Sequence, residues 1–315
     1  MKLHAMPRIL ILILLAGFLF PGQSEAQRWK RMRYELTYGL GASNFLGELG
    51  GADQIGTNQF RDLEFSMTRY VLSAGLRYKL EKWLSIKASL QIGMLRGDDK
   101  LTQEFSRQYR NLSFRSPIYE FAIQIEPSVI KEQAGARYRL RGVKGRKWMA
   151  INTYPFIGIA GFYMNPKAQF NGKWHALQPL TTEGQGQFPT RAKKYSRFQI
   201  AIPIGIGFKY GFNRRWSISL EYGLRKTFTD YIDDVSTTYV HPDYISAGSR
   251  DPDVAISLAD PSDGGLGQSG SAPNKTAPGQ QRGDPHDKDA YMFAIISLNY
   301  KFRKLRKRRR SRPKF

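Results

Sequence analysis

The stretch FQIAIPIGIGFKYGF, residues 198–212, decides the fold, because large apolar residues alternate with small or polar ones along its whole length. Successive side chains of a strand point to opposite faces, so this period of two predicts a strand with one wholly apolar face. The run is longer than most strands of soluble proteins. Lipid on the apolar side and a narrow polar lumen on the other would explain the pattern. A soluble sandwich, with a second sheet on the apolar face, is the alternative.

Seven other segments repeat this alternation, which favours the membrane barrel over the sandwich. They are residues 34–42, 70–80, 84–94, 119–126, 154–165, 216–229 and 289–302, with the weakest alternation in 154–165 and 289–302. The number of segments is even, as bacterial outer-membrane barrels require. The sequence therefore predicts an all-β fold, an eight-stranded antiparallel transmembrane β-barrel.

The connections between these segments alternate between short and long. Tight turns are expected near residues 81–83 and 213–215, and long outer loops over 47–68, 98–115, 166–195 and 234–288. Barrels of this kind have short periplasmic turns and long outer loops. The basic stretch 131–149 is an exception on the periplasmic side, where it could extend two strands into a hairpin. Residues 260–288 are rich in Gly, Ser, Pro and Asp, so we expect a mobile loop there.

The N-terminus has the features of a signal peptide. Lys2 and Arg8 precede an apolar run from Ile9 to Phe20, and the small residues Ser24 and Ala26 follow. We expect cleavage after Ala26, because the run is shorter than the ~20 residues of a membrane anchor. This gives a signal peptide 1–26, a barrel 27–302 and a tail 303–315, with a retained anchor as the alternative. The absence of Cys excludes disulfides, thiolate chemistry and a lipoprotein anchor.

The lumen-facing positions of the predicted strands carry charges of both signs. Eight strands leave an interior that side chains just fill, and an unpaired buried ion costs several kcal/mol. We therefore expect these residues to form an ionic plug rather than line a substrate channel. They are Glu35, Arg77, Lys79, Lys87, Glu120, Gln124, Glu126, Lys209, Glu221 and Arg225.

The stretch FTDYIDDVSTTYV, residues 228–240, is a weak candidate for a calcium site. Asp230, Asp233 and Asp234 supply the oxygen ligands that Ca²⁺ prefers. The spacing of a calcium loop is missing, however, and hydrogen bonding at a strand end explains these residues better. We expect no metal and no cofactor.

An embedded hydrolase is the enzymatic alternative to a structural barrel. It needs a nucleophile, a base and an acid near one another. His175, His241 and His286 are the histidines of the expected mature chain, and His175 could meet a serine or Glu183. No G-x-S-x-G motif is present, so the sequence predicts a protein that is not an enzyme.

Several phrases resemble one family. They are SNFLGELGG (43–51), RNLSFRSPIYEF (110–121), FYMNPKA (162–168), LQPLTTEGQG (177–186) and FTDYIDDVSTTYV (228–240). In this order they are similar to the PorG-type outer-membrane barrel of the Bacteroidetes type IX secretion system. The resemblance implies a non-enzymatic component of a machine that exports cargo with a C-terminal sorting domain and that serves gliding motility in some relatives. It also implies contact with a periplasmic ring of a PorK-like lipoprotein and a PorN-like protein. A small barrel of unrelated role and a lipid-modifying hydrolase are the alternatives.

The C-terminal tail carries a dense run of positive charge that adds to a formal net charge of +23. Export would keep this charge away from cytoplasmic nucleic acid, and strand parity predicts a periplasmic location. There each cation near an anionic membrane surface contributes about 1 kcal/mol. We expect outer-membrane lipids or the ring to be the partner; a solvated charge run is an equal alternative. The candidate contact residues are Arg306, Lys307, Arg308, Arg309, Arg310 and Arg312.

Overall fold

The computed structural model describes residues 32–49, 65–101, 105–130, 151–186, 193–213, 215–262 and 275–302. The expected signal peptide, the 131–149 insertion and the basic tail from residue 303 lie outside these residues.

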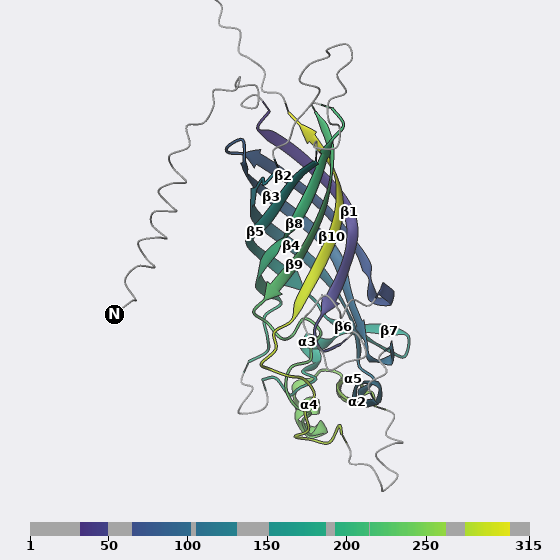
Figure 1. Cartoon of the computed structure of the whole chain (residues 1–315). Helices are drawn as coiled ribbons and strands as arrows, with labels where there is room; N and C mark the ends of the chain where they lie inside the picture. Colours follow the sequence, from purple (N-terminus) through teal and green to yellow (C-terminus); the bar gives the residue numbers. More distant parts are fainter. Residues whose placement is uncertain are drawn as a thin grey trace, which may run out of the picture. The chain divides into compact units, whose positions relative to one another are not determined.

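Eight long strands form one closed antiparallel barrel, which confirms the predicted fold (Figure 1). Around the barrel, β1 pairs with β2 and with β10, and a β3–β4 pairing completes the ring. Each of the eight predicted segments overlaps one strand. The strands are β1 (Tyr34–Leu46), β2 (Arg69–Lys79), β3 (Leu84–Asp98), β4 (Ser113–Pro127), β5 (Ile151–Met164), β8 (Phe198–Gly211), β9 (Trp216–Thr227) and β10 (Ala290–Lys301).

The two faces of the barrel wall differ as the period of two requires. On β8, Ile204 points outward and is 48% exposed, whereas Lys209 points inward and is 2% exposed. Aromatic side chains gather on the outer surface at the end of the barrel with the tight turns, where Trp216 and Tyr300 lie 4.7 Å apart between ring centroids. Such a belt is typical of a membrane interface. We call this end the turn end.

No helix in the described part of the chain is long and apolar enough to cross a membrane.

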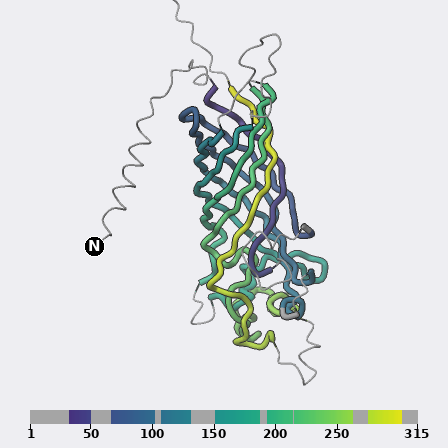
Figure 2. The backbone as a smooth tube through the Cα atoms, in the orientation of Figure 1, coloured from purple at the N-terminus to yellow at the C-terminus, as the bar shows by residue number. Residues whose placement is uncertain are grey.

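The opposite end, the loop end, carries short elements that the sequence prediction missed (Figures 1 and 2). A hairpin joins β6 (Lys167–Phe170) to β7 (Lys173–Ala176). Its two turn residues, Asn171 and Gly172, both have positive φ, as a type I′ turn requires. The other elements are η3 (Phe65–Met67), η4 (Asp99–Leu101), α2 (Phe105–Arg110), α3 (Leu177–Leu180), α4 (Pro242–Gly248) and α5 (Pro252–Ala259).

Residues 275–288 also differ from the expectation of a mobile loop. Arg282 is only 2% exposed, and Gln281 forms a β-bridge with Thr238. A stretch without apolar periodicity is ordered here because its backbone and one arginine are bonded to neighbouring loops.

The interior is polar near the turn end and apolar near the loop end, whereas the sequence predicted a polar lumen throughout. In the loop-end half, inward side chains such as Phe45, Phe114, Phe162 and Phe293 are all at most 3% exposed. They belong to one apolar cluster with Ile232 of a loop. These inward positions are apolar because the loops fold over the barrel mouth and exclude water.

Candidate functional site: the lumen and the loop cap

Arg77 is the centre of a buried ion-pair network in the turn-end half of the lumen. Its Nη1 lies 2.5 Å from Glu35 Oε1 and its Nε 2.5 Å from Glu126 Oε2. Its Nη2 lies 2.9 Å from Glu221 Oε1, while Lys87 Nζ lies 2.5 Å from Glu221 Oε2. These side chains are at most 6% exposed. One guanidinium group thus bonds three carboxylates from three other strands.

Lys209 and Tyr154 extend this network to β8 and β5. Lys209 Nζ lies 3.3 Å from Glu35 Oε2. The Tyr154 hydroxyl donates to Glu221 Oε1 at 2.9 Å and accepts from Arg77 Nη2 at 3.1 Å. Three cations, Arg77, Lys87 and Lys209, thus face the three carboxylates of Glu35, Glu126 and Glu221. The network joins seven strands across the lumen.

A second ion pair lies nearer the loop end. Arg225 Nε is 3.4 Å from Glu120 Oε2, and the Tyr291 hydroxyl donates to the same oxygen at 2.7 Å. The Arg225 guanidinium also lies 4.3 Å from the centre of the Phe293 ring, a cation–π distance. The predicted plug contains nine charged residues. The structure places eight of them, all except Lys79, in the lumen beside an opposite charge. Gln124 is buried with them, and Lys79 is half-buried.

The connections at the loop end fold into one unit, which we call the loop cap: the described residues of 47–49, 99–112, 165–186, 228–262 and 275–289. Glu183 is one of its two centres. Glu183 Oε1 accepts from the backbone amides of Ser236 at 3.0 Å and Thr237 at 3.2 Å, and from Arg282 Nη1 at 3.0 Å. Arg282 Nη1 also donates to the Asp234 carbonyl at 2.6 Å. Glu183 thereby joins three loop segments.

Arg110 is the second centre of the loop cap. It donates two hydrogen bonds to Asp99, Nε to Oδ2 at 2.8 Å and Nη2 to Oδ1 at 3.1 Å. Its remaining donors bind backbone carbonyls, that of Glu48 at 3.0 Å and that of Arg282 at 2.7 Å. Such two-point contacts fix geometry as well as charge. The loop after β1, the loop after β3 and the segment before β10 are joined in this way.

Four carboxyl groups of the loop cap lie close enough to influence one another's charge. Burial, reinforced by the charge of Asp233, raises the pKa of Glu48 to about 9. Burial, reinforced by the charge of Asp230, raises the pKa of Asp233 to about 8. Burial also raises the pKa of Asp230 to about 6 and that of Asp289 well above its usual range. The loop cap thus shifts each of these acids toward its protonated form.

The three aspartates of the weak calcium hypothesis lie in this cap, but they are used differently. Asp234 accepts hydrogen bonds from the hydroxyls of Thr182 and Tyr195. Asp233 Oδ1 accepts from the backbone amide of Val235 at 3.0 Å. Throughout the described ranges, no group of three His, Asp or Glu side chains could hold a metal ion. These hydrogen bonds lie in the loop after β9 rather than at the strand end, and through them Asp233 and Asp234 help to hold that loop.

The three histidines of the enzymatic alternative, His175, His241 and His286, lie in three different segments of the loop cap. His175 lies in β7 opposite Ala168, and His241 is the residue that caps α4. Glu183, the acid considered for His175, is instead bonded to Arg282 and to two backbone amides. What the described loops offer is a set of fixed ion pairs and hydrogen bonds that hold them together.

Sequence reasoning did not find Arg110 or Arg282. Each is a single arginine in a stretch without periodicity, and its role depends on loops far away in sequence. Glu183 was considered only as a partner of His175. Asn171-Gly172 was a usable signal for the missed hairpin, because this pair favours the type I′ turn.

The closed barrel, with its apolar outer face, aromatic belt and ion-paired lumen, defines an outer-membrane β-barrel protein. A family model described as the outer membrane protein beta-barrel domain matches residues 10–244, so the chain belongs to that family.

Solved barrels are similar at low sequence identity. Ail of Yersinia pestis, in complex with sucrose octasulfate, shares 8% identity with a TM-score of 0.37, over 86% of this chain and 99% of Ail. OprG of Pseudomonas aeruginosa shares 8% identity with a TM-score of 0.34, over 87% of this chain and 98% of OprG. A major outer membrane protein of Thermus thermophilus shares 10% identity with a TM-score of 0.34, over 85% of this chain and 99% of that protein. At these values the likenesses say nothing about what this chain does. Among curated proteins, no sequence is similar enough to count as a relative.

Proposed function

We propose that the protein is a non-enzymatic outer-membrane component of a type IX secretion machine. One observation supports this most: the five stretches that carry the family resemblance, far apart in sequence, contact one another at the loop end. Arg110 of the second stretch donates to the Glu48 carbonyl of the first at 3.0 Å. The backbone amide of Asn165, in the third, donates to Ser116 of the second at 3.1 Å.

The fourth and fifth stretches are joined in the same way. The Thr237 hydroxyl donates to Glu183 Oε2 at 2.7 Å, and the Thr182 hydroxyl donates to Asp234. A resemblance scattered along the chain thus falls on one region of the fold, the loop cap together with the strand ends beneath it. Unrelated barrels have no physical reason to share such a set, because loop sequences vary freely when no common structure depends on them.

The lumen favours a structural role over a pore or an enzyme. Three carboxylates converge on Arg77 and close the turn-end half with fixed charges. The apolar cluster fills the loop-end half. A substrate in the lumen would have to displace both the ion pairs and the apolar cluster, and breaking several buried ion pairs is costly.

We also propose a partner, the periplasmic ring of the secretion machine, which the barrel contacts. The turn end faces the periplasm in barrels with short periplasmic turns. It presents exposed residues of both turns, among them Glu81, Trp83, Asn213 and Arg215. The expected signal peptide delivers the chain to the envelope, and the basic residues Arg306–Arg312 follow the last strand in the sequence. The loop cap, on the other side, is not part of the proposed contact.

Site-specific photo-crosslinking in the native host tests this partner. A photoreactive amino acid is placed at Glu81, Asn213 or Arg309, and at Asp243 and Arg250 in the loop cap as controls. We expect the ring lipoprotein or the PorN-like protein to be captured from the first set and not from the second. Capture of neither protein from any turn-end or tail position would refute the ring contact.

A further inference from the structure

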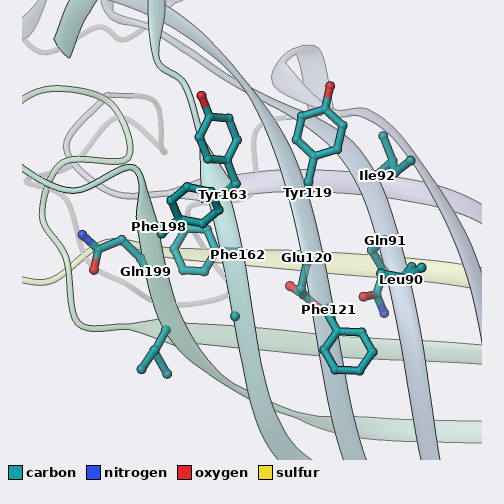
Figure 3. A pocket seen from close by; sticks show the side chains of 12 residues that line it. Leu90, Gln91, Ile92, Tyr119, Glu120, Phe121, Phe162, Tyr163, Phe198 and Gln199 are labelled. Atoms are coloured by element: carbon teal, nitrogen blue, oxygen red, sulfur yellow. The ribbon is translucent and has the colours of Figure 1, made fainter. Parts of the chain in front are cut away.

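An apolar groove lies on the outward face of the barrel wall, across β3, β4, β5 and β8 (Figure 3). Its volume is about 500 Å³. Its outward-facing walls are mostly aromatic or branched side chains, all exposed except Tyr163, which is partly buried: Leu90, Ile92, Tyr119, Phe121, Tyr163, Phe198 and Ile200. The groove belongs to the half of the wall nearer the loop end, because Tyr163 and Phe198 pair where β5 ends and β8 begins.

Gly161 forms the floor of the groove. In the register of the sheet it pairs with Phe121 on one side and Ile200 on the other. A Cβ atom at Gly161 would meet no atom within 4 Å, whereas one at Gly158 of the same strand would lie 2.1 Å from the Ile123 carbonyl oxygen. Backbone packing therefore requires glycine at Gly158 but not at Gly161. The missing side chain at Gly161 leaves space on the wall.

Aromatic rings border this space on the side of the loop end. The rings of Tyr119 and Tyr163 lie 6.2 Å apart, and those of Tyr163 and Phe198 lie 4.9 Å apart, between centroids. Within a bilayer this face is not hydrated, so the hydrophobic effect does not drive binding there. A flexible hydrocarbon chain would gain dispersion contacts with the exposed ring faces and with the space at Gly161.

Arg197 places a positive charge beside the groove at the loop end, and two lysines precede it in the sequence. Arg197 precedes β8, and its Nη1 donates to the Tyr163 hydroxyl at 3.3 Å. Lys193 and Lys194 are exposed, and no acidic residue lies between positions 193 and 200. Long loops face outward in such barrels, so this charge is at the outer interface. Its complement is an anionic headgroup attached to an acyl chain.

We propose that the groove binds one acyl chain of lipid A, the phosphorylated lipid of the outer leaflet, with a phosphate group near Arg197, Lys193 and Lys194. The acyl chain lies over Gly161 between Phe121 and Ile200. Arginine suits the headgroup because its planar donors match phosphate oxygens. This binding is independent of the secretion role.

Native mass spectrometry of protein extracted from outer membranes in mild detergent tests the groove. Gly161→Leu fills the floor, and Ala294→Leu, on the outward face of β10 and away from the groove, is a control of the same kind. We expect the affinity for lipid A, obtained from its occupancy, to fall about tenfold in Gly161→Leu, which equals about 1.4 kcal/mol, with no change for Ala294→Leu. Heat-dependent gel mobility verifies that each variant is folded.

Two further measurements distinguish the contribution of the lipid headgroup to binding from that of the acyl chain. Arg197→Gln is expected to lower lipid A occupancy while leaving the groove open. Protein refolded with lipid A and phosphatidylglycerol in equal amounts is expected to retain lipid A. Equal retention of lipid A by folded Gly161→Leu and by the unaltered protein, or equal binding of both lipids, would overturn the proposal.

Discussion

The buried carboxylate of Glu183 and the guanidinium of Arg282 lie 3.0 Å apart, and both side chains are at most 2% exposed. Together they join the segment after α3, the loop after β9 and the segment before β10. This pair and Arg110 are the two buried charged centres that join the segments of the loop cap.

Removal of Arg282 should therefore open the loop cap. Arg282→Met leaves the Glu183 charge buried without its cation, which costs about 3 to 5 kcal/mol. We expect faster cleavage of the loops by added protease at a temperature at which the barrel stays folded. Arg250→Met, at an exposed position of the loop cap, is the matched control and should leave the cleavage rate unchanged. Equal cleavage rates for the two variants would contradict the role of the pair.

Removal of Arg77 should destabilise the barrel itself. Arg77→Met leaves Glu35, Glu126 and Glu221 without their shared cation, and breaking even one buried pair costs about 3 to 5 kcal/mol. We expect a lower urea midpoint for unfolding in detergent, measured by tryptophan fluorescence and gel mobility. Arg215→Met, in an exposed turn, should keep the original midpoint. A midpoint unchanged in Arg77→Met would mean that the network does not stabilise the fold.

The loop cap should be more stable in mild acid than in base. Burial raises the pKa of Asp233 from 3.8 to about 8 and that of Glu48 from 4.5 to about 9. When folding raises the pKa of a carboxyl group, the contribution of that group to the free energy of unfolding is fully present below its unfolded pKa. This contribution is lost as the pH rises through the folded pKa. Cleavage of the loops should therefore speed up between about pH 5 and about pH 9. Protease rates are corrected at each pH with an unfolded substrate.

Substitution of the two acids checks the cause of this pH dependence. In the double variant Glu48→Gln, Asp233→Asn the side chains keep their shape but do not titrate, so the cleavage rate should vary less with pH. The double variant Asp243→Asn, Asp253→Asn, at exposed positions of α4 and α5, should retain the full dependence. A profile that remains as steep without Glu48 and Asp233 would assign the effect to other groups.

The purified protein should not conduct ions. Fixed ion pairs fill the turn-end half of the lumen and packed side chains fill the loop-end half. In planar bilayers we expect no stable conductance steps, whereas a porin measured in the same way gives them. Reproducible ohmic steps from the folded protein would show that the lumen opens.

A strand of this barrel is easy to predict from the sequence where only one of its faces is apolar. It is harder to predict where both faces are apolar. In β8 the inward residues are small or polar, so the period of two is plain. In β10, Tyr291, Phe293 and Ile295 point inward while Met292 and Ile296 point outward, so apolar residues follow one another and the period is blurred. The inward apolar residues belong to the core that the loop cap covers. The apolar–polar alternation is therefore weak in strand segments whose inward and outward faces are both shielded from water.

The loop cap could not be predicted because its order comes from contacts between distant segments. Arg110 and the Arg282 carbonyl are 172 positions apart in the chain, and no local propensity indicates that they meet. The lumen charges, by contrast, follow from strand parity alone, and all of them except the half-buried Lys79 are buried inside the barrel. Only their pairing, with Arg77 bonded to three carboxylates, required three-dimensional information.

Export of sorting-domain cargo tests the central claim, a role in type IX secretion, most directly. The amount of this cargo on the cell surface and in the periplasm is measured in a deletion strain, with and without restored full-length protein. The account predicts that cargo accumulates in the periplasm and that restoration returns it to the surface. Normal export in the deletion strain, accompanied by a leaky envelope or altered lipid, would contradict the secretion role and favour a structural or lipid-modifying barrel.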